Sequence, residues 1–146
     1  MIKHTTFTLE RDFPVPPAEV FARWADPQSK ATWFAGPKAE HELDFRVGGT
    51  EIAKGVNGEG EQLAFEGVYR EIVPGERIVY SGVLSVGDTV ATVSQTTVQF
   101  EASSTGTRLL LTEQGAFLDG HEEPEWRQTG CGSQLDALEK LISDAG

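Results

Sequence analysis

Cys131 is the single cysteine of this 146-residue sequence, and a glycine stands on each side of it. A thiol becomes a nucleophile where a neighbouring base or cation lowers its pKa. Cys131 has no adjacent histidine, and a buried free cysteine otherwise behaves as a small hydrophobic residue. We therefore predict that Cys131 borders a ligand site and takes no part in nucleophilic catalysis.

The histidines indicate no metal centre. His4, His41 and His121 are far apart in the sequence, and none has a partner at the spacing of metal ligands. The sequence also lacks the motifs of phosphate-binding loops, nucleophilic serines and zinc proteases. We expect no metal, no cofactor and no catalytic residue, although the many acidic residues leave a paired-carboxylate site open.

Arg11 shares the alternation of Phe7, Leu9 and Phe13, so its side chain is expected on the interior face of a strand. A guanidinium in that position must be paired or hydrated. It could bind a ligand carboxylate or phenolate through its fork of donors. The alternative is a structural ion pair, or a side chain that reaches out to solvent at the strand end.

Aromatic side chains could line an apolar pocket, with hydroxyl and indole N–H groups orienting a ligand. Trp33, Tyr69 and Trp126 are the preferred candidates because they combine bulk with a polar group, whereas most other aromatic residues are expected in the core. With Arg11 and Cys131, the predicted ligand-contacting residues are Trp33, Phe45, Tyr69, Tyr80, Trp126 and Leu135.

Residue periodicity arranges these candidates along one strand, two short helices, six strands and a long helix. Alternation predicts the first strand over residues 5–13, and proline opens the helix that begins at Pro17. A second short helix is expected over residues 28–33. Further strands are expected at 41–47, 50–56, 63–73, 77–84, 89–101 and 107–114, and the last helix at 124–143.

A meander of antiparallel strands has one face to bury, and only the last helix is long enough to cover that face. The sequence thus predicts an α+β fold in which a curved antiparallel sheet of six to seven strands wraps around the long C-terminal helix. The length fits a single domain over residues 1–146.

The charge of the chain excludes some partners. The formal net charge is -11 and the pI is about 4.6, so nucleic acid and anionic membrane surfaces would be repelled. The N-terminus lacks the pattern of a signal peptide, and no apolar run approaches the roughly 18 residues that span a bilayer. We expect a cytoplasmic protein.

Several segments, taken in order, resemble one protein family. They are residues 11–13, 16–21, 24, 26–27, 33–37, 44–49, 67–72, 74–80 and 106–109. Together they resemble the family named after the C-terminal domain of the activator of the heat-shock-protein-90 ATPase, which belongs to the START-like helix-grip (SRPBCC) superfamily. The resemblance implies a cavity between sheet and long helix, used across the superfamily for lipids, sterols, polyketides and other apolar molecules. Function varies widely on this scaffold, so the fold alone names no ligand.

One position departs from the family pattern. The helix segment that matches residues 130–131 more often carries glycine followed by tryptophan, whereas this chain has cysteine between two glycines. Each glycine inside a helix costs about 1 kcal/mol relative to alanine. Small side chains facing the sheet also leave volume that a bulky residue would fill. One hypothesis is that a ligand occupies this volume; the alternative is that Trp126 or a large strand residue fills it.

The sequence favours a binding protein that takes a hydrophobic or aromatic small molecule without transforming it. A second hypothesis is a co-chaperone-like module that binds a heat-shock ATPase through its surface, as the family name implies. A third is an enzyme acting on an apolar substrate, which is less favoured because no convergent acid, base and nucleophile are evident. A homodimer also stays open.

Overall fold

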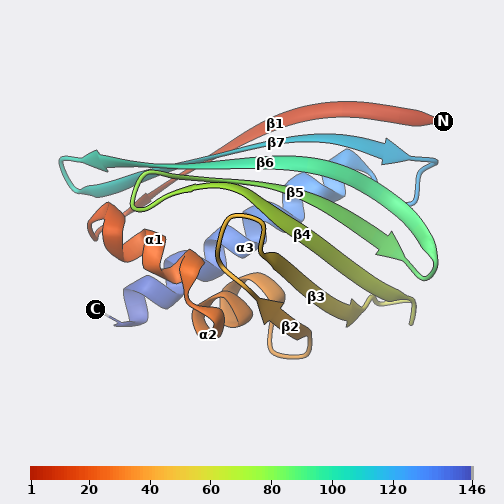
Figure 1. The fold of residues 1–146 in the computed structure, drawn as a ribbon, viewed down its shortest axis with the longest axis horizontal. Helices are drawn as coiled ribbons and strands as arrows, with labels where there is room; N and C mark the ends of the chain where they lie inside the picture. Colours follow the sequence, from red (N-terminus) through yellow and green to blue (C-terminus); the bar gives the residue numbers. More distant parts are fainter. Residues whose placement is uncertain (146) are drawn as a thin grey trace.

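The computed structural model describes residues 1–145 and contains a seven-stranded antiparallel sheet with a long helix across one face (Figure 1). The strand order is β1-β7-β6-β5-β4-β3-β2, so β2 to β7 form a meander and β1 pairs beside β7. The strands are β1 (Ile2–Phe13), β2 (Glu40–Leu43), β3 (Thr50–Val56), β4 (Gln62–Val73), β5 (Arg77–Val86), β6 (Thr89–Ser103) and β7 (Gly106–Leu118).

The helices follow β1 and β7. They are α1 (Pro17–Ala25), α2 (Pro27–Lys30), the π-helical turn η1 (Ala31–Ala35) and α3 (Pro124–Ala145). Each α-helix begins with proline, whose fixed φ suits the first helical position and whose missing N–H is not needed there. The Asp26 carboxylate accepts a hydrogen bond from the Ser29 backbone N–H at 2.9 Å and caps α2.

The core lies between the sheet and α3. The helix buries Leu135, Leu138 and Ile142, which recur at helical spacing. Burying each of these side chains contributes about 1.5–3 kcal/mol. The sheet residues of the same core are Phe7, Phe13, Tyr69, Ile78, Tyr80, Val98, Phe100, Leu109 and Leu111. The predicted α+β helix-grip fold is therefore confirmed, with two short helices after β1 and the long helix at the C-terminal end.

The strand predicted over residues 41–47 is wrong in its second half. β2 is only four residues long, and the chain then turns back toward β4. Gly48 has a φ of 83°, and a Cβ at Gly49 would overlap the backbone of the preceding turn. The Gly48 N–H donates to the Tyr69 carbonyl at 2.8 Å, and the Tyr69 N–H donates to the Gly49 carbonyl at 3.0 Å. Phe45 consequently lies in a loop and not in a strand.

Two strands run further than predicted because they pair with each other. β1 begins at Ile2, β7 continues to Leu118, and these two residues are register partners at the end of the ladder. Within residues 1–145, no helix is long and apolar enough to cross a membrane.

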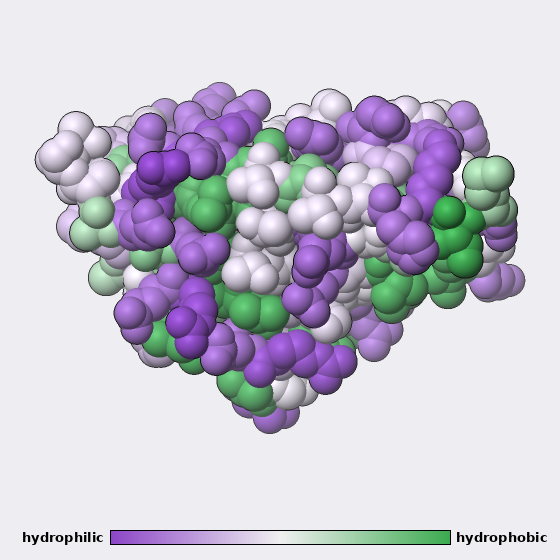
Figure 2. Space-filling model, turned by 90° about the horizontal axis from the view of Figure 1, so that it is seen from above, coloured by the Kyte–Doolittle hydropathy of each residue, from purple (hydrophilic) through white to green (hydrophobic). Residues whose placement is uncertain are grey.

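The face of the molecule drawn in Figure 2 is mainly hydrophilic, as the net charge of -11 leads one to expect. Its hydrophobic residues form small, separate groups among polar ones (Figure 2). A scatter of this kind is ordinary for a protein surface and needs no partner to explain it.

Candidate functional site

A cavity of about 580 Å³ lies between the sheet and the N-terminal half of α3. Its walls come from α1, from η1 and the loop after it, from β3, β4, β5 and β7, and from α3 and the loop before it. Sites for small molecules in proteins usually measure about 300–1,000 Å³. The cavity therefore has the size of a small-molecule site.

Aromatic side chains form much of the cavity wall. The Phe65 ring lies over the paired glycines Gly67 and Gly82, where a Cβ would come within 3.1 Å and 2.5 Å of the ring. Trp126 is 63% exposed and marks the opening of the cavity to solvent. The other aromatic wall residues are Trp24, Trp33, Phe34 and Tyr80.

The two glycines of α3 have different surroundings. Gly130 and Cys131 line the cavity, and a Cβ at Gly130 would meet no atom within 4 Å. A Cβ at Gly132 would instead lie 3.6 Å from Nη2 of Arg11. Trp126 stands at the cavity opening and leaves the space beside Gly130 and Cys131 unfilled. The small residues of α3 thus keep part of the cavity open.

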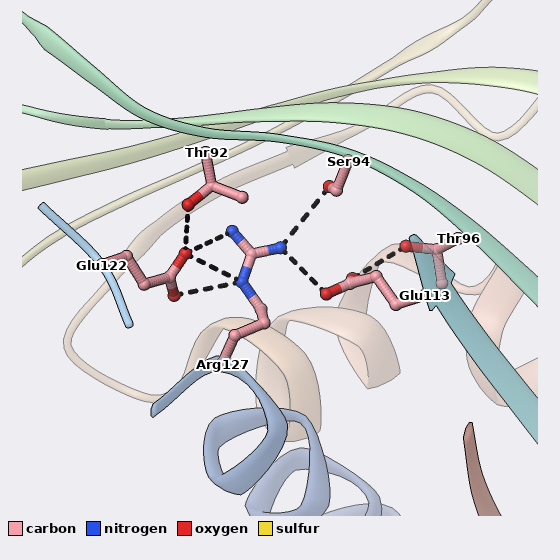
Figure 3. Close-up of polar contacts among 6 residues, drawn as sticks. All are labelled: Thr92, Ser94, Thr96, Glu113, Glu122 and Arg127. Atoms are coloured by element: carbon pink, nitrogen blue, oxygen red, sulfur yellow. Dashed lines mark hydrogen bonds and ion pairs between the residues drawn. The ribbon is translucent and has the colours of Figure 1, made fainter. Parts of the chain in front are cut away.

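Arg127 forms the polar end of the cavity together with Glu113 and Glu122, and all three line it (Figure 3). Nη2 of Arg127 lies 2.8 Å from Oε1 of Glu122, and Nη1 lies 3.2 Å from Oε2 of Glu113. Glu113 comes from β7, Glu122 from the loop before α3, and Arg127 from the first turns of α3. The cluster therefore joins three segments at one end of a cavity whose walls are largely aromatic and aliphatic.

Hydroxyl groups of β6 complete this cluster (Figure 3). Thr92 donates to Glu122 at 2.6 Å, and Thr96 donates to Glu113 at 2.9 Å. Ser94, between them on the same face, accepts from Arg127 at 3.4 Å. Each buried polar group of the cluster thus has a partner, which offsets the free energy of removing it from water.

The electrostatics of the cluster favour positive charge. Burial opposes the charged form of Arg127, but its hydrogen bonds to Glu122 and the charges of both carboxylates raise the pKa of Arg127, so it stays a cation. Burial, reinforced by the charge of Glu113, raises the pKa of the Cys131 thiol to about 12. The thiol is consequently protonated at neutral pH, which does not suit a nucleophile.

A second buried ionic cluster lies on the other side of the aromatic wall. Nζ of Lys30 lies 4.2 Å from the centre of the Phe34 ring and 5.1–5.8 Å from the ring centres of Trp24, Trp33 and Tyr80. These four rings also line the cavity, whereas Lys30 is not among its lining residues. The wall is therefore two-sided, with a ligand-sized space on one side and a lysine ammonium on the other.

Glu51 is the centre of that second cluster. Its Oε1 accepts from Lys30 at 2.9 Å and from the Tyr69 hydroxyl at 2.7 Å, and its Oε2 lies 2.7 Å from Nε2 of His41. Burial alone would raise the pKa of Glu51, but the charge of Lys30 and these hydrogen bonds hold that pKa at about 2. Burial lowers the pKa of Lys30, partly offset by Glu51. Glu51 therefore carries its charge inside the protein at neutral pH.

The structure places five of the predicted ligand-contacting residues on the cavity and three elsewhere. Those that line it are Trp33, Tyr80, Trp126, Cys131 and Leu135. The three that do not line it are Arg11, Phe45 and Tyr69.

Each of the three residues that do not line the cavity has a structural role. Arg11 does lie on the interior face of β1, but it pairs with Asp136 and Glu139 of α3, each at 3.2 Å. Arg11 therefore forms the structural ion pair that was the alternative to ligand binding. The Tyr69 hydroxyl donates a hydrogen bond to Glu51, and burial and the charge of that carboxylate raise the pKa of the hydroxyl. Phe45 packs edge-on against the Tyr69 ring at 5.0 Å.

The polar cluster at Arg127 was missed, although the sequence held a signal for it. Thr92, Ser94 and Thr96 occupy the positions of β6 that alternate toward the core, where apolar residues are the rule. Glu113 likewise follows Leu111 on the buried face of β7. Polar residues at core-facing positions of two paired strands indicate a buried network or a site.

Metal binding receives no support from the residues that the structure describes. Among residues 1–145, no three His, Cys, Asp or Glu side chains gather closely enough to hold a metal ion. The two carboxylates that line the cavity, Glu113 and Glu122, are instead paired with the guanidinium of Arg127.

Solved structures resemble the chain over nearly its full length. An uncharacterised protein of Rhizobium leguminosarum is 37% identical, covers 99% of this chain and 97% of its own, and superposes with a TM-score of 0.94. A protein of Rhizobium loti is 39% identical over 96% of this chain and 98% of its own, with a TM-score of 0.89. A protein of Chromobacterium violaceum is 30% identical over 94% of this chain and 96% of its own, with a TM-score of 0.79. No curated protein matches the sequence.

The family model described as activator of Hsp90 ATPase homolog 1-like protein matches residues 14–143. That range takes in both short helices, six of the strands and nearly all of α3. The chain therefore belongs to the activator of Hsp90 ATPase homologue 1-like family, within the SRPBCC helix-grip superfamily.

Proposed function

We propose that the protein binds an apolar small molecule in the cavity between the sheet and α3. The observation that carries the proposal is the open volume of about 580 Å³, kept partly free by Gly130 and Cys131. The cavity opens to solvent beside Trp126, so its aromatic walls lie against water, and a ligand that covered them would remove apolar surface from water.

The lining supports binding more than catalysis. Aromatic rings offer a large contact area, and the buried ionic groups of the lining are gathered in one cluster, as in sites that orient an apolar ligand. Arg127 is held between two carboxylates, and the Cys131 thiol is protonated at neutral pH because its pKa is raised to about 12. These groups are arranged to hold a polar group and not to exchange protons near neutral pH.

The test uses N-phenyl-1-naphthylamine, a neutral apolar dye that brightens when it leaves water. We expect saturable fluorescence enhancement with the native protein and a rise in its unfolding temperature, because a ligand that binds only the folded state stabilises it by mass action. Cys131→Trp places an indole in the cavity and should abolish both effects. Ser133→Trp, on an exposed position of the same helix, is the matched control and should preserve them.

Two results would contradict the proposal. One is the absence of saturable binding by a panel of neutral aromatic and aliphatic compounds to a correctly folded protein. The other is binding that persists unchanged in a folded Cys131→Trp variant, because the dye would then sit outside the cavity.

A further inference from the structure

We infer that the ligand of this cavity is an organic cation, an apolar molecule with a protonated amine held against Glu113 at the polar end. This inference rests on the proposed function, since it assigns a chemical class to the ligand of the same cavity.

The charge balance of the polar end is the first argument. Two carboxylates, Glu113 and Glu122, surround the single guanidinium of Arg127, which leaves one negative charge uncompensated within the cluster. Both acids serve as acceptors in every hydrogen bond they make within the described residues, as carboxylates do. A cation of the ligand would complete this charge balance.

The unused hydrogen-bond acceptors of Glu113 are the second argument for a cationic ligand. Glu113 accepts one bond on each oxygen, from Thr96 and from Arg127, and a carboxylate has about four acceptor positions. Within residues 1–145, all but one of the N–H groups of Arg127 already face Glu122, Glu113 or Ser94. An ammonium group would find open acceptors at this cluster. A carboxylate ligand would find almost no free donor there and would be repelled by the charge of Glu113.

The wall of the cavity favours a cation as well. The faces of aromatic rings attract ammonium groups, and four of these rings already do so for Lys30 on their far side. Burial and then the charge of Glu113 raise the pKa of both Tyr80 and Cys131, two groups that line the cavity, so negative charge is disfavoured there.

The positive groups near the cavity do not reverse this preference. Lys38 and Lys54 also line it, but both are exposed to solvent, where water and salt screen their charge. The ammonium of Lys30 is paired with Glu51 at 2.9 Å on the far side of the rings.

Three fluorescent probes with one skeleton test the inference. They are N-(5-aminopentyl)dansylamide, N-pentyldansylamide and N-(5-carboxypentyl)dansylamide, which carry an ammonium, no charge and a carboxylate on the same chain. A hydrogen bond to a charged group contributes about 1.5–3 kcal/mol, so we expect the amine to bind at least about tenfold more tightly than the other two.

Two variants locate the preference. Glu113→Gln keeps the shape of the side chain and removes the uncompensated charge, so the amine should then bind within about twofold of the neutral probe. Glu122→Gln makes the same change in charge on the other side of Arg127 and serves if Glu113→Gln does not fold. Glu125→Gln, on an exposed position of α3, changes the net charge equally and should leave the preference intact.

The outcomes separate this inference from the proposed function. An amine preference that Glu113→Gln removes and Glu125→Gln keeps supports the inference. Equal affinity for the three probes, blocked by Cys131→Trp, overturns it and leaves the proposed function standing. A preference for the amine that neither Glu113→Gln nor Glu122→Gln changes would come from attraction to the acidic surface, and it overturns the inference. Failure of all three probes to bind overturns the inference together with the proposed function.

Discussion

Nζ of Lys30 lies 2.9 Å from Oε1 of Glu51, and the two side chains are 0% and 1% exposed. Charges so far from water are stable only when they are paired and hydrogen-bonded. Here Tyr69 and His41 supply the further bonds, and four aromatic rings surround the ammonium. The cluster joins α2 to β2, β3 and β4. It thereby fixes the helical segment that carries one wall of the cavity.

Glu51→Gln should destabilise the protein strongly, because it leaves the Lys30 ammonium buried without its counter-charge. Breaking a buried pair by removing one partner costs about 3–5 kcal/mol. Urea unfolding followed by tryptophan fluorescence would measure the loss. The double variant Lys30→Met with Glu51→Gln should recover much of it, and a single variant within about 0.5 kcal/mol of wild type would contradict the importance of the pair.

The stability of the protein should fall in acid through Glu51. Its pKa is about 2 in the folded state and 4.5 in an ordinary glutamate. A depressed pKa stabilises the folded state above the unfolded value, so this contribution is complete above about pH 5 and is lost as the pH falls from 4.5 to about 2. Unfolding free energies measured across that window should show the decline. Comparison with Glu51→Gln isolates it, because that variant should have a flatter profile there.

Gly130→Ala should stabilise α3. Alanine in place of a glycine within a helix gains about 1 kcal/mol, and the new methyl group would meet no atom within 4 Å. Thermal unfolding should therefore shift upward by several degrees. Gly132→Ala is the comparison and should gain less, because its methyl group would contact the Arg11 side chain at 3.6 Å. Destabilisation by Gly130→Ala would show that the space beside this residue is smaller than described.

Arg11→Gln should weaken the fold slightly and leave ligand binding unchanged. Arg11 joins β1 to α3 through Asp136 and Glu139, but all three side chains are partly or largely exposed to solvent, where such a pair contributes about 0.2–1 kcal/mol. The loss should shrink in high salt. Dye titration of the variant should give the wild-type affinity, since Arg11 does not line the cavity. A large loss of affinity would restore Arg11 as a ligand-binding residue.

Cys131 should react slowly with thiol reagents in the native state. Burial and the charge of Glu113 raise its pKa to about 12, so little thiolate is present near pH 8. Rates of reaction with iodoacetamide should be far higher in urea-unfolded protein. Glu113→Gln should accelerate the native reaction because one of the charges opposing the thiolate is gone, whereas Glu125→Gln should not. Equal rates in the two variants would place Glu113 outside the field that Cys131 experiences.

The periodicity of apolar residues correctly predicted the helices and strands that bury one face in the core. The leucines of α3 recur at helical spacing, and the alternation of β1 correctly placed Arg11 beside Phe7 and Phe13. Periodicity failed after β2, where Phe45 continues the alternation although the chain has left the sheet. The reason is non-local: Gly48 and Gly49 pair with Tyr69, and no local pattern encodes that partner.

The candidate site was predictable in its apolar part only. Trp33, Tyr80 and Cys131 were expected on the cavity and do line it. The pairing of Lys30 with Glu51 joins residues 21 positions apart and depends on how the end of α2 lies against β3. A heat-shock ATPase partner, a homodimer and a cytoplasmic location remain predictions.

The two-sided aromatic wall gives the cavity one rigid side and one adjustable side. A larger ligand that pushed Trp33 or Phe34 outward would press these rings against the buried Lys30 side chain, so this side resists expansion. Gly130 and Cys131 of α3 also line the cavity, and a larger side chain at either position would reduce the available space. Substitutions at two positions of one helix would therefore alter the cavity volume while the Lys30–Glu51 pair stays intact.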